Sequence, residues 1–198
     1  DSLLEALGVL ANGQGTMNNL TFGNKHFQYY ETISGGSGAG LNFNGASGVQ
    51  VHMTNSRLTD PEILENRFPV ILRNFSIRKG SGGKGRYSGG DGVIRCFEFK
   101  EGVNLSLLTN RRSNGAKGLL DGEKGYPGLN IVEKLNEKRI FLSSSIDLDL
   151  NKGEYLSIES PGGGGVGKVE DFDKNYYFAY GSNMSIEQMK RRCPESEI

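Results

Sequence analysis

The side chains best suited to catalysis or binding in this 198-residue chain lie between Gly45 and Glu65. An imidazole, an amide, hydroxyl groups and a guanidinium follow one another there, in His52, Thr54, Asn55, Ser56, Arg57 and Thr59. A polar loop that follows a strand is a common way to assemble a catalytic or binding site. The plain alternative is an ordinary surface loop with one histidine, and the residues alone leave both interpretations open.

Two elements are expected to position this loop. Apolar and polar residues alternate over 49–54, which predicts a half-buried strand. Asp60 stands at the N-cap position of a helix, Pro61 at its first position, and Ile63 and Leu64 begin its apolar face. We therefore expect a strand, then the polar loop, then a helix that starts at Pro61.

The composition excludes several classes of protein. Lys plus Arg and Asp plus Glu both number 23, and this balance argues against nucleic acid or an acidic membrane surface as the main partner. No run of 18 apolar residues predicts a membrane span. The first residues carry acids and no basic region or initiator Met, so we expect no secretory signal and a longer parent chain. Cys96 and Cys193 lack metal-site or redox spacing, which favours the cytoplasm.

Glycine is unusually frequent, with 30 residues gathered in clusters between strand-like segments. Such clusters indicate tight turns, positive φ angles, or backbone pressed against a ligand or another backbone. The segments between them, for example 68–72, 103–108 and 139–142, predict strands. We therefore predict a strand-rich α+β fold with Gly-rich loops. In the predicted strand 27–33 we expect core tyrosines and a surface acid at Glu31.

Three glycine clusters are candidate binding loops. Gly35–Gly40 lacks the ending of a P-loop, so it is a weak nucleotide motif, but its N–H groups are a possible nest for an anion. The run 79–92 suggests an anion-binding loop in which Lys84 or Arg86 holds a carboxylate or phosphate; the alternative is tight strand connections with solvated cations. Gly162–Gly165 is expected to lie close to a ligand or backbone, or to be a flexible tail.

Six stretches, in this order along the chain, resemble the C-terminal part of the hydantoinase B/oxoprolinase family, and its 5-oxoprolinase members in particular. They are residues 14–23, 29–40, 52–65, 78–85, 89–95 and 160–165. The resemblance assigns residues 1–168 to the C-terminal part of a hydantoinase B-like domain.

The resemblance implies part of an ATP-dependent amidohydrolase that opens a cyclic amide, with 5-oxo-L-proline opened to L-glutamate as the leading reaction. A hydantoin-type hydrolase or a ketone carboxylase subunit is the alternative within the family. The family binds ATP with a divalent metal mainly in a hydantoinase A-type region, which is absent from this chain, as is the N-terminal part of the B region. This fragment is therefore expected to be inactive alone. We therefore expect a small-molecule substrate, a hydantoinase A-type region or subunit as partner, and a homo-oligomer.

The resemblance also assigns roles to the polar residues. His52 is the expected base or metal ligand, Asn55 an oxyanion donor and Arg57 a carboxylate clamp. The expected substrate-binding residues are Thr54, Ser56, Lys84, Arg86 and Asp91. The chain departs from the family pattern at Gln50, Asn110, Asp121 and Val166. Since Gln50 and Asn110 replace a histidine and an acid, a non-catalytic remnant or interaction module is a further alternative.

The C-terminal residues change in character after a charged linker over 169–175. Residues 176–198 resemble the opening of a γ-glutamylcyclotransferase-like domain, a short βα segment that is truncated here. The resemblance places a substrate-binding loop at Tyr180, Gly181, Ser182 and Asn183. A third interpretation is a cyclotransferase with an unusual N-terminal extension, which requires more chain after Ile198.

Overall fold

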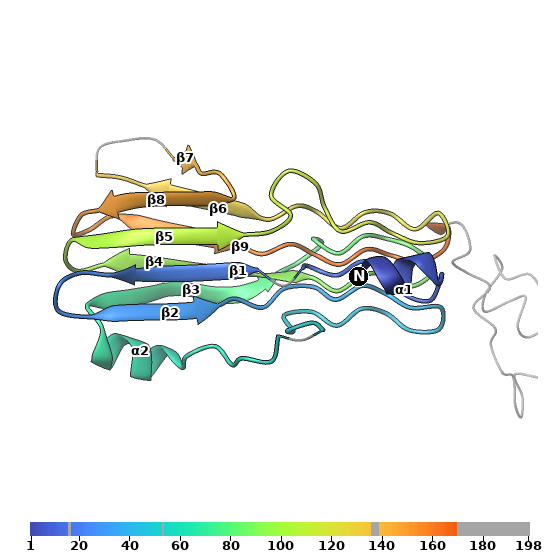
Figure 1. The fold of residues 1–198 in the computed structure, drawn as a ribbon, viewed down its shortest axis with the longest axis horizontal. Helices are drawn as coiled ribbons and strands as arrows, with labels where there is room; N and C mark the ends of the chain where they lie inside the picture. The colour runs from blue at the N-terminus through green and yellow to red at the C-terminus, as the bar shows by residue number, and fades with distance from the viewer. Residues whose placement is uncertain (16, 53, 136–138, 170–198) are drawn as a thin grey trace, which may run out of the picture.

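The described part of the chain is built around two antiparallel sheets. A computed structural model describes residues 1–169 except 16, 53 and 136–138. The first sheet has the strand order β2-β1-β5-β8, and its strands are β1 (Asn18–Gly23), β2 (Gln28–Thr32), β5 (Val103–Thr109) and β8 (Ser145–Leu150). The second has the order β3-β4-β9-β6-β7, and its strands are β3 (Val70–Arg78), β4 (Gly92–Phe99), β6 (Leu129–Glu133), β7 (Ile140–Phe141) and β9 (Tyr155–Glu159). The sheets lie face to face in Figure 1.

The core lies between the two sheets. Along β5, buried and exposed residues alternate strictly, as expected for a strand with one face in a core. Aromatic rings from both sheets meet there: Phe22 of β1 and Phe99 of β4 lie edge to face with their ring centroids 5.2 Å apart. The predicted strand-rich α+β architecture is therefore confirmed.

Two short helices accompany the sheets, α1 (Ser2–Ala6) and α2 (Pro61–Arg67). The predicted start of α2 is confirmed, because the Asp60 side chain caps the helix by accepting from the Glu62 N–H at 2.9 Å. Leu64 is the residue of α2 that enters the core. No helix of the described residues is long and apolar enough to cross a membrane.

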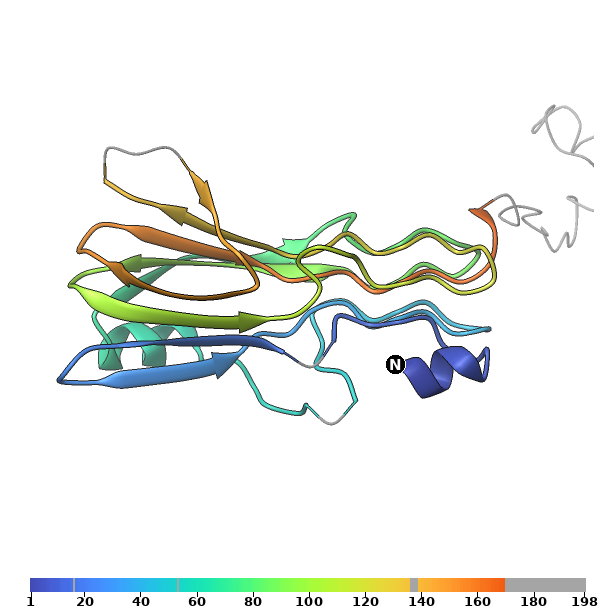
Figure 2. The ribbon, with the colours of Figure 1, turned by 45° about the horizontal axis from the view of Figure 1, so that its top comes forward.

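The glycine clusters form a separate structure that extends from one end of the sandwich. We call this structure the glycine bundle. It consists of residues 11–14, 35–48, 81–91, 115–126 and 160–167. These segments extend side by side, away from the strands (Figures 1 and 2). Hydrogen bonds between backbone groups join them, and the buried segment 160–166 runs through their middle.

The hydrogen bonds of the central segment repeat every three residues. The N–H donors and carbonyl acceptors pair as Gly162–Tyr126, Gly163–Gly90, Gly164–Asn12, Gly165–Glu123 and Val166–Tyr87. Successive donors thus point to different neighbouring segments, and the fourth and fifth return to the first two. A repeat of three residues is that of an extended helix of the polyproline II kind, in which glycine permits close packing.

The bundle corrects two expectations about the glycine clusters. The anion nest at Gly35–Gly40 is wrong, because its N–H groups are already bound: those of Gly36, Ser37 and Ala39 donate to the carbonyls of Pro161, Ala46 and Gly164. The flexible-tail interpretation of Gly162–Gly165 is also wrong, because these residues are buried and hydrogen-bonded. The glycines are pressed against other backbone segments of the same chain.

The strand predicted over 49–54 is also wrong. Val49 exchanges both backbone hydrogen bonds with Gly35, at 2.8 and 3.2 Å, in an isolated bridge. The pairing ends there, since the Gln50 amide turns to the Thr32 carbonyl at 2.7 Å and His52 has a positive φ of 56°. The polar residues therefore lie on an irregular loop. The linker after residue 169 and the segment 176–198, with its predicted site at 180–183, lie outside the described residues.

Candidate functional site

His52 lies in a cluster with an acid and a second cation. Its Nε2 atom is 2.5 Å from Oδ1 of Asp1, and Nη2 of Arg111 donates to the other oxygen of the same carboxylate at 3.0 Å. A quarter of the His52 side chain is exposed. Both His52 and Arg111 have a positive φ, at 56° and 52°. Two residues in the left-handed region therefore converge on one carboxylate, and such backbone strain is concentrated at functional sites.

Two influences act on the His52 imidazole. Burial lowers its pKa, which favours the neutral ring that can accept a proton. The Asp1 carboxylate, 2.5 Å from Nε2, fixes the orientation of the ring. A histidine held in this way is suited to act as a general base.

Three predicted residues that follow His52 in the sequence line a hollow on the outer face of the first sheet. Thr54, Asn55 and Ser56 form one wall of a cavity of about 400 Å³. The remaining wall is the outer face of β1 and β2, with Met17, Asn19, Tyr30 and Thr32. The hollow therefore offers hydroxyl and amide groups within two to four residues of His52 along the chain. Arg57 follows directly and is exposed.

A larger hollow, about 540 Å³, lies further along the same sheet face and includes Asn104, Ser106, Asp147 and Asp149. Its lining contains no histidine, lysine or arginine. Two carboxylates without a cation would repel an anionic ligand. The smaller hollow has no carboxylate in its lining and contains residues two to four positions after His52, so it is the better candidate for a reaction on a carboxylate-bearing molecule.

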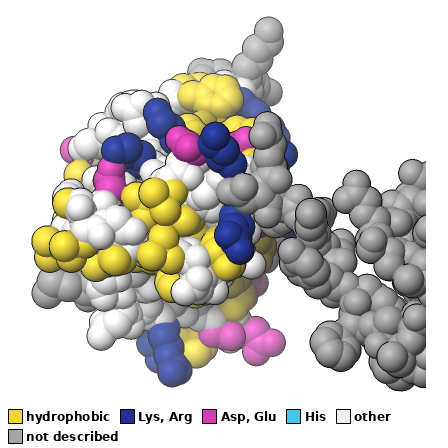
Figure 3. Space-filling model, turned by 90° about the vertical axis from the view of Figure 1, so that its right-hand side faces the viewer, with side chains coloured by type: hydrophobic (Ala, Val, Ile, Leu, Met, Phe, Trp, Pro, Cys, Tyr) yellow, Lys and Arg dark blue, Asp and Glu magenta, His cyan; other side chains and the backbone are white. Residues whose placement is uncertain are grey.

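The structure does not bring Lys84 and Arg86 to His52. Both side chains are exposed on the bundle. Arg86 lies against Tyr87, with its guanidinium carbon 5.8 Å from the ring centroid, and borders a hollow of about 330 Å³ at the end of the bundle. Figure 3 shows that hydrophobic side chains gather on this end of the molecule, with Lys and Arg side chains beside them.

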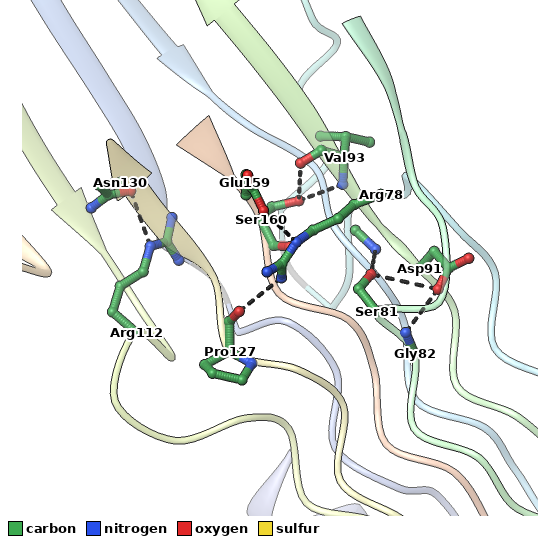
Figure 4. Close-up of polar contacts among 11 residues, drawn as sticks. Arg78, Ser81, Gly82, Asp91, Val93, Arg112, Pro127, Asn130, Glu159 and Ser160 are labelled. Atoms are coloured by element: carbon green, nitrogen blue, oxygen red, sulfur yellow. Dashed lines mark hydrogen bonds and ion pairs between the residues drawn. The ribbon is translucent and has the colours of Figure 1, made fainter. Parts of the chain in front are cut away.

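Asp91 lies apart from both places, where the sandwich passes into the bundle (Figure 4). Its carboxylate accepts from the Gly82 N–H at 2.7 Å and from the Ser81 hydroxyl at 3.5 Å. Its own N–H donates to the Ser47 hydroxyl at 2.8 Å. These contacts join two bundle segments to the start of β4, so Asp91 stabilises the fold at this junction.

The same junction contains two arginines that hold strand ends together. Arg78 pairs with Glu159 at 2.7 Å and donates to the Pro127 carbonyl at 2.7 Å. Arg112 donates to the amide oxygens of Asn130 and Asn18, at 3.0 and 2.9 Å. Burial, together with the nearby Arg78 cation, lowers the pKa of Arg112 to about 9. Figure 4 shows the Arg78 contacts and the Arg112–Asn130 bond beside the start of the glycine bundle.

Two residues that depart from the family pattern, Gln50 and Asn110, form hydrogen bonds to the backbone. Gln50 donates to the Thr32 carbonyl and so ties the polar loop to β2. The Asn110 side chain accepts from the Met17 N–H at 2.9 Å, next to the hollow. Both amides are satisfied by backbone groups.

Sequence reasoning missed one pair of residues near the loop. Glu31, expected at the surface, is buried and forms an ion pair with Arg95, which is fully buried in β4. Tyr29 is buried as expected, whereas Tyr30 is exposed. The alternation of side chains along β2 places Tyr29 and Glu31 on one face. The partner of Glu31 is 64 residues away, and no local signal points to it.

The described residues do not fit a metal site. They contain no group of three or more His, Cys, Asp or Glu side chains that is able to hold an ion. His52 has one carboxylate neighbour, Asp1, and that carboxylate already binds the Arg111 guanidinium. A metal ion placed there would be repelled by the guanidinium.

Comparison with known proteins identifies the family. The family model described as hydantoinase B/oxoprolinase matches residues 1–169. The chain is 51% identical over 170 residues to a 5-oxoprolinase of Dictyostelium discoideum, covering 86% of this chain and 13% of that protein. It is 49% identical over 167 residues to 5-oxoprolinase 1 of Arabidopsis thaliana, covering 84% and 13%. The chain thus spans about an eighth of the length of these relatives.

Solved structures share the fold. An ATP-dependent caprolactamase from Pseudomonas jessenii matches with a TM-score of 0.67 and 20% identity, covering 81% of this chain and 30% of that one. A nucleotide-free acetone carboxylase matches with a TM-score of 0.65 and 17% identity, covering 81% and 27%. The sandwich with its glycine bundle is therefore a part of larger proteins. The family match covers all of the described residues, and the chain belongs to the hydantoinase B/oxoprolinase family.

Proposed function

We propose that this chain is part of an ATP-dependent amidohydrolase that opens a cyclic amide, and that the ring is 5-oxo-L-proline, which is opened to L-glutamate. The observation that carries the proposal is the sequence identity of 51% and 49% to two 5-oxoprolinases over most of this chain. The polar loop from His52 to Arg57 lies within the matched family segment.

The cluster around His52 supports a hydrolytic role. In the proposed reaction, His52 takes a proton from water, the water oxygen bonds to the ring carbonyl carbon, and the ring C–N bond breaks. The nitrogen leaves with a proton as the amine of glutamate. Asp1 fixes the orientation of the imidazole.

The hollow lined by Thr54, Asn55 and Ser56 supports binding of the ring. Thr54 and Asn55 are donors for the oxygen on which negative charge develops. Arg57, which follows the hollow-lining Ser56, is the proposed partner of the substrate carboxylate. ATP with a divalent metal, bound in a hydantoinase A-type region, supplies the activation of an otherwise unreactive amide. We also propose that the complete enzyme contains that region as a domain or subunit.

The test makes each change in the complete enzyme, which contains the hydantoinase A-type region and the whole hydantoinase B domain, and measures glutamate formed from 5-oxo-L-proline and ATP. His52→Gln is expected to lower kcat at least 100-fold, as for the loss of a general base. His26→Gln is the matched control, because His26 is the other histidine and is exposed in the turn between β1 and β2. Its activity is expected to equal that of the unchanged chain.

Each failure of this test has its own meaning. Unchanged turnover in His52→Gln would remove His52 from the mechanism and leave the reaction in place. Turnover with hydantoin or caprolactam in place of 5-oxo-L-proline would move the proposal to another cyclic amide. If the complete enzyme turns over none of these rings, the non-catalytic interpretation replaces the proposed function.

A further inference from the structure

The buried ion pair between Glu31 and Arg95 crosses the sandwich core. Nε and Nη2 of Arg95 donate to the two oxygens of Glu31 at 2.8 and 2.9 Å. The side chains are 0% and 2% exposed. Arg95 also lies against the rings of Phe75 and Phe97, 5.0 and 5.3 Å from their centroids. The pair therefore links β2 of one sheet with β4 of the other.

Both members of the pair also bind the backbone of Thr59. The Thr59 N–H donates to Oε1 of Glu31 at 3.0 Å, and the Thr59 carbonyl accepts from Nη2 of Arg95 at 3.1 Å. Thr59 ends the polar loop, directly before the helix cap at Asp60. The other end of the loop is held at Val49, whose carbonyl accepts from Gln14 and from Gly35. The residues from His52 to Arg57 thus lie between two fixed points.

Stability alone does not account for this pair. Two charges lose their hydration on burial, and a well-packed apolar pair of similar volume is often as stable or more so. Among the described residues, Nη1 of Arg95 also has no hydrogen-bond partner, which adds to the cost. An apolar pair would fill the same space but offer no donor and acceptor to Thr59. What the charged pair adds, and an apolar pair would not, is that it holds the loop in position.

We infer that Glu31 and Arg95 are positioning residues, which fix the loop 54–59 beside the hollow and thereby set the place of its catalytic and binding groups. The inference depends on the proposed function only where activity is concerned. The position of the loop is measurable without any substrate.

The test compares two double variants by amide hydrogen exchange. In Glu31→Leu/Arg95→Met, the Thr54 amide, which donates to the Val51 carbonyl and does not touch the pair, is expected to exchange at least tenfold faster, while the amides of β4 and β5 stay within twofold. The control, Arg73→Met/Glu98→Leu, removes a more exposed ion pair between β3 and β4 that does not touch the loop. It is expected to leave exchange in 54–59 unchanged. Unchanged loop exchange in the first variant would overturn the inference.

Arg95→Lys decides the question if the apolar variant fails to fold. Lysine keeps the buried charge but not the planar fork that reaches Glu31 and Thr59 together. Faster exchange at Thr54 with an unchanged sheet supports the inference, and unchanged exchange at both places overturns it.

The activity measurement separates this inference from the proposed function. In the complete enzyme, the apolar variant is expected to lose at least tenfold in kcat, whereas the control keeps the kcat of the unchanged enzyme. A loosened loop with undiminished kcat would contradict the positioning of catalytic groups. If the unchanged complete enzyme does not open 5-oxo-L-proline, the proposed function fails, and a loop that keeps its exchange rates would still overturn the positioning role.

Discussion

His52 and Arg111 each adopt a left-handed backbone conformation, and both side chains bind Asp1. Such conformations cost about 1 kcal/mol or more for residues other than glycine, so the surrounding structure must impose them. For His52 the neighbouring contacts are known: Gln50 binds Thr32, and the Thr54 N–H returns to the Val51 carbonyl. The imidazole and the hydroxyl groups can be read from the sequence, but the backbone turn that orients these side chains cannot.

The burial of Tyr29 predicts how the stability of the protein depends on pH. Burial and the neighbouring Glu31 carboxylate raise the pKa of Tyr29 to about 12. Between pH 10 and 12 the unfolded chain loses the phenol proton while the folded chain keeps it, so the free energy of unfolding falls as the pH rises. Since one pKa unit corresponds to about 1.4 kcal/mol, we expect a fall of roughly 2–3 kcal/mol.

Urea unfolding at several pH values between 9 and 12 measures this fall. Tyr29→Phe is expected to lack it. Tyr30→Phe is the neighbouring control and should behave like the unchanged chain, because it leaves Tyr29 in place. An equal dependence on pH in Tyr29→Phe and the unchanged chain would show that other groups cause the loss of stability.

At the scale of elements, the glycine bundle depends on the absence of side chains. A Cβ atom added to Gly163 would lie 1.8 Å from the carbonyl oxygen of Ser37, and one added to Gly89 would lie 2.1 Å from that of Gly163. Both obstacles are backbone atoms, which cannot move aside without shifting a whole segment. The glycines of the bundle are therefore required by its packing, as in a collagen triple helix.

Gly163→Ala is expected to lower the free energy of unfolding by roughly 3 kcal/mol, because the added methyl group overpacks the bundle. Gly102→Ala is the matched control: a Cβ there meets its nearest atom at 3.8 Å, an ordinary contact. We expect it to change stability by less than about 0.5 kcal/mol. Denaturant unfolding of both variants measures the difference, and equal stabilities would contradict the packing requirement.

The elements differ in how far the sequence reveals them. β5 and β9 are readable from their apolar residues, and the start of α2 from Asp60 and Pro61. β8 was missed although Ser145–Leu150 alternates, so its signal was present. The bundle is different, since Gly164 donates to Asn12, 152 positions earlier in the chain. Glycine clusters indicate a close approach of backbone, but nothing local identifies the partner segment.

For the whole molecule, sandwich and bundle are made from the same stretches of chain. Segment 160–167 continues directly from β9, and the bundle segment 81–91 connects β3 to β4. Arg78 and Arg112 hold neighbouring strand ends together at the junction (Figure 4). Opening the bundle would remove hydrogen bonds at the ends of several strands at once. The two layers should therefore unfold as one cooperative unit.

Amide hydrogen exchange at increasing denaturant tests this cooperativity. The amides of Gly163–Gly165 and those of Leu105–Leu107 are expected to report opening free energies within about 1 kcal/mol of each other, since both open only by global unfolding. Gly163→Ala in the bundle and Leu105→Ala in the buried core of the sandwich should each lower both values together. If Gly163→Ala lowers the value in the bundle alone, the bundle opens independently of the sandwich. The strands would then stay folded while the bundle segments separate, and the junction arginines would not couple the two layers.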